Sequence, residues 1–240
     1  MKETPLVKPI PFKGFSKKRI IYIPLDSPQS TIYLNVKKHI RKNKQTPFGQ
    51  IFLLKDKVLL YQCLSSPLAV LSLERLIASG AKEIIMLGFC GSLIPGSKIG
   101  DAVSITGAIS EEGTSKHYFS RKRSFSPSPS LRKRIEDVLD SKKFAYSKAT
   151  LVTTDAPFRE TLPWFKEKQH QHIGAVDMET SAVFALAEYY GLQAAALMLV
   201  SDILTEDKHN IGFFNPLLHK NIKKYFLPFI LGEGKDETYR

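Results

Sequence analysis

Short apolar runs, separated by polar, glycine and proline residues, recur along the whole chain. Several of them are continuous and lack the polar–apolar alternation of a half-exposed strand. Runs of this length and composition are typical of strands buried in a largely parallel sheet. We therefore predict strands at residues 19–23, 51–54, 58–63, 83–87, 102–109, 149–153 and 194–201.

Apolar residues at helical spacing occupy segments between these runs. The first predicted helix opens at Ser66-Pro67, because proline suits the first turn, and it stops at Gly80. Others are predicted at residues 130–141, 178–190 and about 215–230, and Gly191 ends the helix that starts at 178. Because strands and helices alternate, we predict an α/β fold: one domain over residues 1–240, a three-layer α/β/α sandwich with a central mixed, mostly parallel sheet.

Composition places the chain among soluble proteins with a substantial core. Of its 240 residues, 43% are hydrophobic, and its two cysteines, Cys63 and Cys90, both lie in apolar runs. This placement predicts reduced core thiols and hence a reducing compartment, the cytoplasm. The N-terminal segment lacks the apolar stretch of a secretory signal, and the apolar run at 192–204 is too short to span a bilayer. We expect no membrane partner.

The net charge of +12 comes from short basic runs scattered along the chain. They carry no interleaved aromatic residues and accompany no nucleic-acid-binding motif, so we interpret them as solvated surface that can steer anionic substrates. No nucleic-acid partner is expected. His170 and His172 have no third ligand at a suitable spacing, and no metal site is predicted.

Two carboxylates stand at the ends of apolar segments. Glu179, in Asp177-Met178-Glu179, opens an apolar helix, and Asp202, after Ser201, closes an apolar strand. Such positions are where α/β enzymes hold small polar substrates. One carboxylate that accepts two hydroxyl hydrogen bonds, and another that holds or passes a proton, suit a sugar attached to a nitrogen base. Taken singly, a helix-dipole role for Glu179 and a turn role for Asp202 explain each residue better, and only the two together favour the functional reading.

A glycine-rich segment, Gly88-Phe89-Cys90-Gly91-Ser92, follows a predicted strand, and alone it indicates no more than a tight turn. Together with residues 100–101, 112–115, 153–161, 177–179 and 201–202, it has the order and spacing of one family. The chain resembles the nucleoside phosphorylase superfamily, which includes purine nucleoside phosphorylases, uridine phosphorylases and related nucleosidases. The resemblance covers residues 65–204, and residues 1–50 diverge.

The resemblance implies cleavage of the N-glycosidic bond of a purine-type nucleoside, without a metal or organic cofactor. It also implies a homo-oligomer built from dimers. Asp202 would be the catalytic residue, acting with Ser201 at N7 of the base. The implied substrate-binding residues are Glu179 at the ribose hydroxyls, Met178 under the sugar, Phe158 against the base, and the turn containing Gly88 and Gly91 beside the nucleophile.

The phosphate site of the family is altered in this chain. Where phosphorolytic members have an arginine and a serine or threonine, the chain has Met86 and Phe89, which cannot bind phosphate. Two nucleophiles are possible. One is phosphate, held by another cation such as Arg159 or a neighbouring subunit's Arg41, and the other is water. We predict a phosphorylase first and a nucleosidase as the alternative, with a nucleoside-binding protein that has lost turnover as a third reading.

Overall fold

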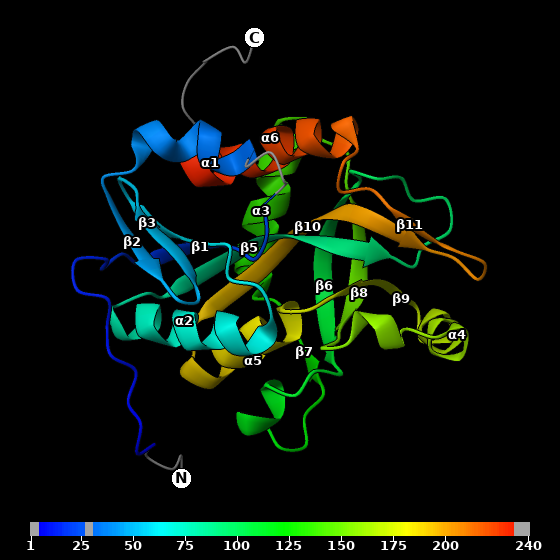
Figure 1. Cartoon of the computed structure of the whole chain (residues 1–240), viewed down its shortest axis with the longest axis horizontal. Coiled ribbons are helices and arrows are strands. Elements are labelled where there is room, and N and C mark those ends of the chain that lie inside the picture. The colour runs from blue at the N-terminus through cyan, green and yellow to red at the C-terminus, as the bar shows by residue number, and fades with distance from the viewer. Residues whose placement is uncertain (1–4, 27–30, 233–240) are drawn as a thin grey trace.

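The computed structural model describes residues 5–26 and 31–232. A mixed sheet forms its centre, and helices lie on both sides of that sheet (Figure 1). The strands are β1 (Arg19–Ile23), β2 (Lys42–Thr46), β3 (Gly49–Leu53), β4 (Lys57–Tyr61), β5 (Glu83–Ser92), β6 (Ala102–Ser110), β7 (Ser124–Phe125), β8 (Ser147–Thr153), β9 (Ile173–Asp177), β10 (Gln193–Leu204) and β11 (His209–Ile211).

The α-helices are α1 (Thr31–Val36), α2 (Ser66–Ala78), α3 (Pro129–Ser141), α4 (Leu162–His170), α5 (Thr180–Tyr190) and α6 (Pro216–Leu231). Short 3-10 turns occur at η1 (Lys37–His39), η2 (Ser115–His117) and η3 (Pro157–Arg159). Helix α2 packs against α5 on one side of the sheet, and α6 packs against α1 and β10 on the other (Figure 1). The predicted α/β class with a central sheet and flanking helices is confirmed.

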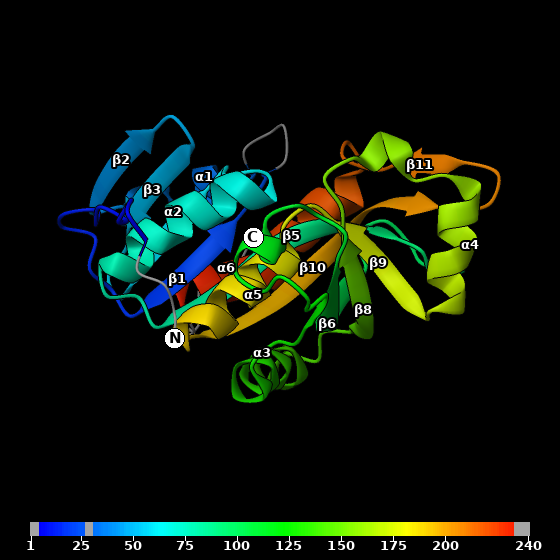
Figure 2. The ribbon, with the colours of Figure 1, turned by 90° about the horizontal axis from the view of Figure 1, so that it is seen from below.

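The sheet runs in the order β11-β10-β6-β8-β9-β5-β1-β4-β3-β2, with β7 beside β6. Strand β5 pairs in parallel with β1 and β10, and it also pairs antiparallel with β9. Since β10, β6, β8 and β9 pair in turn, the sheet closes on itself around β5, which the sequence did not predict. Figure 2 shows the outer strands β2 and β3 at one end of the molecule, and α4 with β11 at the other.

Two long strands correct the predicted boundaries. Strand β5 continues through residues 88–92, so this segment is a strand and not the predicted turn. Gly88 lies there because β5 and β10 pack closely: a Cβ on Gly88 would sit 2.9 Å from the Met198 sulfur. Strand β10 extends to Leu204 and therefore contains Asp202. Helix α5 starts at Thr180, after Met178 and Glu179, and ends as predicted at Gly191, whose φ is 68°.

Among the elements that the sequence did not predict, β2, β9 and α4 were missed for different reasons. Strand β2 is polar and mostly exposed, because it pairs only with β3 at the outer edge of the sheet. Strand β9 reads Ile-Gly-Ala-Val-Asp, and its glycine, alanine and aspartate disfavour a strand, so its signal is weak. Helix α4 presents few apolar residues, of which Phe165 is buried in a small cluster with Leu93, Val152, Ile173 and Val176.

The remaining apolar residues form one large core on both sides of the sheet. Cys63 and Cys90 are free thiols buried in it, as predicted, and burial raises the pKa of both. Within the described residues, no helix is both long and apolar enough to cross a bilayer.

Candidate active site

A cavity of about 500 Å³ opens where β5, β9 and β10 approach their carboxyl ends. Its size suits a small-molecule ligand. The residues predicted for a nucleoside site meet here: Gly91, Phe158, Met178, Glu179, Ser201 and Asp202 all line it. Gly88 does not line the cavity because it lies further back in β5, and Arg159 is exposed outside it.

Glu179 is fixed by the segment that precedes α2. Its carboxylate is 4% exposed and accepts a hydrogen bond of 2.6 Å from the Ser65 backbone N–H. Ser65 has a φ of 80°, a conformation that favours glycine, so the backbone is strained where it holds the carboxylate. The neighbouring Ser66 hydroxyl donates to the Met178 carbonyl oxygen over 2.7 Å. Residues 65–66 thereby hold residues 178–179 at the cavity.

Asp177 is a buried partner of Glu179. Its carboxylate accepts hydrogen bonds from the Thr153 hydroxyl (2.7 Å) and from the Thr180 backbone N–H (2.9 Å). Burial raises the pKa of both carboxyl groups; the charge of Asp177 raises the pKa of Glu179 further, and the Ser65 N–H opposes this rise. Glu179 is therefore a stronger proton acceptor than an exposed glutamate.

Asp202 lies at an irregularity of β10, where the register with β5 shifts between Val200 and Asp202. Bulges of this kind redirect side chains. One carboxylate oxygen accepts a hydrogen bond from the Ser201 hydroxyl at 2.6 Å, and the other lies 2.8 Å from His209 Nε2. The Asp202 side chain is 17% exposed. Both oxygens are thus engaged before any ligand binds.

Sequence reasoning missed His209 because nothing in the sequence shows that β11 folds back onto β10. The two strands pair antiparallel, which brings His209 beside the end of β10. The only available signal is the polar loop after an apolar strand, at residues 205–208, which is typical of a hairpin.

Glu160 is a second missed residue. It follows η3 and lines the cavity, and no hydrogen bond or ion pair of its carboxylate occurs within the described part of the chain. Burial, and then the charge of Asp202, raises the pKa of Glu160 to about 7, although His209 opposes this rise. Phe158 stands nearby and is fully exposed, at 100%, so no described residue covers it and its ring is free to cover a ligand.

The ionisable groups of the cavity are mostly acidic. Among the described residues that line it are four carboxylates, Glu160, Asp177, Glu179 and Asp202, with one histidine and no lysine or arginine. Phe89, at the position predicted to lack a phosphate ligand, packs against Phe213 and Phe226 with ring centroids 5.9 and 6.1 Å apart. The cavity therefore favours a cation or a neutral ligand over an anion.

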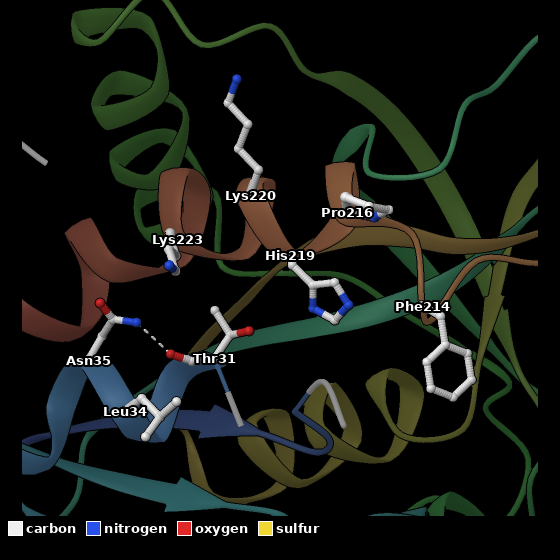
Figure 3. A pocket seen from close by; sticks show the side chains of 8 residues that line it. All are labelled: Thr31, Leu34, Asn35, Phe214, Pro216, His219, Lys220 and Lys223. Atoms are coloured by element: carbon white, nitrogen blue, oxygen red, sulfur yellow. Dashed lines mark hydrogen bonds between the residues drawn. The ribbon is translucent and has the colours of Figure 1, made fainter. Parts of the chain in front are cut away.

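A second cavity, of about 770 Å³, lies between α1 and α6 (Figure 3). Lys220, Lys223 and His219 line it together with exposed apolar residues. It is larger, but it contains none of the predicted site residues and no carboxylate, so we assign the candidate site to the smaller cavity. No group of three or more potential metal ligands occurs within residues 5–26 and 31–232.

Known proteins resemble this chain in sequence and in fold. A family model described as the phosphorylase superfamily matches residues 38–230. The chain is 31% identical to guanosine phosphorylase of Halorubrum lacusprofundi over 134 residues, and this match spans only 56% of each protein. The fold is similar to that of purine nucleoside phosphorylase from Toxoplasma gondii, with a TM-score of 0.77 and 21% identity over 95% of this chain and 96% of that chain. It is also similar to the 5'-methylthioadenosine/S-adenosyl homocysteine nucleosidase of Campylobacter jejuni, with a TM-score of 0.74 and 16% identity over 90% and 97% of the two chains.

Gly91 leaves no room for a side chain between the two acidic strands. A Cβ there would lie 2.9 Å from Asp202 Oδ2 and 3.0 Å from Val176 Cγ1. We expect Gly91→Ala to lower the free energy of unfolding by about 1–3 kcal/mol, measured by urea denaturation. Gly107→Ala is the control, because its new methyl group would meet no atom closer than 3.6 Å. Equal effects of the two substitutions would contradict this account of Gly91.

Glu160 should make stability depend on pH. Its pKa rises from 4.5 to about 7 on folding, so the folded chain holds the proton more tightly, and this group lowers the free energy of unfolding as pH increases between those values. Glu160→Gln removes this pH-dependent decrease in the free energy of unfolding. The gain in melting temperature over wild type should therefore be larger above pH 7 than below pH 4.5, as followed by thermal denaturation.

Glu167→Gln provides a control of opposite sign. The hydrogen bond from Lys168 lowers the pKa of Glu167, so its removal should cost stability at neutral pH and matter less as the carboxylate becomes protonated in acid. If the change in melting temperature caused by Glu160→Gln varied with pH in the same direction as that caused by Glu167→Gln, the raised pKa of Glu160 would be wrong.

Proposed function

Because this chain belongs to the phosphorylase superfamily, we propose that it cleaves the N-glycosidic bond of a purine-type nucleoside. The observation that carries this proposal is the presence of Glu179 and Asp202 in one nucleoside-sized cavity, Glu179 between β9 and α5 and Asp202 in β10. A lone carboxylate binds many ligands, but two separated carboxylates can hold the sugar and the base of the same molecule.

In the proposed complex, Glu179 accepts hydrogen bonds from the ribose hydroxyls and Met178 packs under the sugar. Asp202, held by Ser201, interacts with N7 of the base, and Phe158 covers the base from the mouth of the cavity. As the bond breaks, positive charge develops on the sugar and electrons move to the base. The carboxylates favour the first change and a proton at Asp202 favours the second.

We propose water as the nucleophile. A phosphate dianion would face four carboxylates, with no lysine or arginine on the described walls to compensate. An unpaired charge in a partly buried site costs several kcal/mol, whereas water carries no such penalty. The Phe89–Phe213–Phe226 cluster fills space with aromatic rings and offers an anion no donor.

Phosphorolysis is the second candidate, and the similarity to guanosine phosphorylase of Halorubrum lacusprofundi supports it. It requires a cation from outside the described walls. Arg159 lies close in sequence to Phe158, and Arg41 of a neighbouring subunit is the other candidate, if the chain forms the proposed dimer-based homo-oligomer. The proposal includes no metal or organic cofactor and a cytoplasmic location.

The test is to incubate the protein with inosine, guanosine, adenosine, uridine and methylthioadenosine, with and without phosphate, and to measure free base. We expect release from purine nucleosides without phosphate. Release only with phosphate would replace hydrolysis by phosphorolysis. Binding by calorimetry without release would identify a protein that has lost turnover, and the absence of both would reject the proposed function.

Asp202→Asn should lower turnover by roughly 10²–10⁴-fold, because the amide cannot carry a proton to the base. Asp137→Asn is the matched control, since Asp137 is an exposed acid on α3 and does not line the cavity. Both variants should keep the wild-type circular dichroism spectrum. A fully active Asp202→Asn enzyme would remove Asp202 from the mechanism.

A further inference from the structure

The contact between Asp202 and His209 has no role in the mechanism so far. We propose that His209 supplies the proton that Asp202 delivers to the leaving base. This inference rests on the proposed function and adds a residue to it: Asp202 touches the substrate, and His209 acts through Asp202 as a positioning residue and a source of protons.

The hydrogen bonds of Asp202 carry the argument. The Ser201 hydroxyl donates to Oδ1 over 2.6 Å, with the Cys90 carbonyl oxygen as a more distant second acceptor at 3.3 Å, and a serine does not titrate. Oδ2, by contrast, faces a histidine nitrogen at 2.8 Å. Histidine is the side chain that both holds and releases a proton near neutral pH. The proton of this contact can therefore reside on either partner.

The position of His209 allows solvent to reprotonate its imidazole. Its side chain is 52% exposed and lines the mouth of the cavity, whereas the Asp202 side chain is only 17% exposed. Water reaches the imidazole more readily than it reaches the carboxylate. A bound nucleoside would shield Asp202 further, and His209 would then be the remaining connection to solvent.

The charged groups that face His209 from other elements are acidic. Asp202 faces it from β10, and Glu160 faces it from the segment after η3. The residues beside it in the hairpin loop are Glu206, Asp207 and Lys208, all exposed, and Lys166 of α4 pairs with Glu206. No lysine or arginine of the described cavity wall offsets the two acids, Asp202 and Glu160, that face the His209 ring from other elements.

The proton balance of the cycle is simple. One proton moves from His209 Nε2 to Asp202 Oδ2 and from Asp202 to N7 of the base. The electron pair of the N-glycosidic bond passes to the base, which leaves as a neutral molecule. Water adds to the sugar carbon and releases one proton, and the neutral imidazole takes up one proton from solvent. No oxidant or further co-reactant is needed.

The experiment compares His209→Asn with wild type. Asparagine can still donate a hydrogen bond to Asp202, but it has no proton to give up. His170→Asn is the control, because His170 is an exposed histidine at the end of α4. We expect His209→Asn to lower kcat on inosine by roughly 10²-fold and to change KM by less than about threefold.

Two readouts separate proton supply from a structural role. The wild-type rate should fall as pH rises, because His209 loses its proton, and His209→Asn should lack this fall. With p-nitrophenyl riboside, whose leaving group departs as a stable anion, His209→Asn should work at nearly the wild-type rate. Equal losses on both substrates, no loss on either, or an unchanged pH profile would each overturn the proposal.

Failure of the proposed function is distinguishable. In that case wild-type protein releases no base from any nucleoside, and both proposals fall together. If wild type is active and His209→Asn is equally active on inosine across the pH range, only the role of His209 is wrong.

Discussion

The backbone pairing of Gly91 connects the two halves of the candidate site. On one side Gly91 of β5 pairs with Val176 of β9, and on the other it pairs with Asp202 of β10. Glu179 follows directly after β9, so both carboxylates are positioned by strands that share one neighbour. A side chain at this position would push against both strands, because the space around it is already filled. The closed part of the sheet therefore determines the separation of the two acids.

Charge and burial act together in the cavity that results. Removing carboxylates from water raises their pKa, and placing several of them near one another raises it further. Such a site binds protons readily and resists anions. Both properties suit the departure of a base from a sugar that becomes positively charged, and neither suits a bound phosphate. The same wall composition thus accounts for the proposed leaving-group chemistry and for the proposed nucleophile.

The sequence predicted the class of the fold and the main acids, because these depend on local patterns. Continuous apolar runs identified β4, β8 and β10, and Glu179 and Asp202 followed from the order of the motifs. The closure of the sheet around β5 and the contact of His209 with Asp202 depend on pairings between distant or folded-back strands. Glu160 was missed because its raised pKa comes from burial in the folded cavity, where no described residue forms a hydrogen bond or ion pair with its carboxylate, and the sequence shows neither feature. Residues 88–92 were taken for a turn because two glycines more often interrupt a strand than allow two strands to pack beside it.

The hairpin of β10 and β11 has a consequence for how such a protein can diverge. Its tip, at residues 205–208, is exposed and belongs to no core cluster. Substitutions there leave the core intact and can change the position of the His209 imidazole relative to the Asp202 carboxylate. If the proposed activity holds, selection can adjust its pH optimum through a peripheral loop while the scaffold stays constant, and paralogues adapted to different cellular pH would be expected to vary first at that tip.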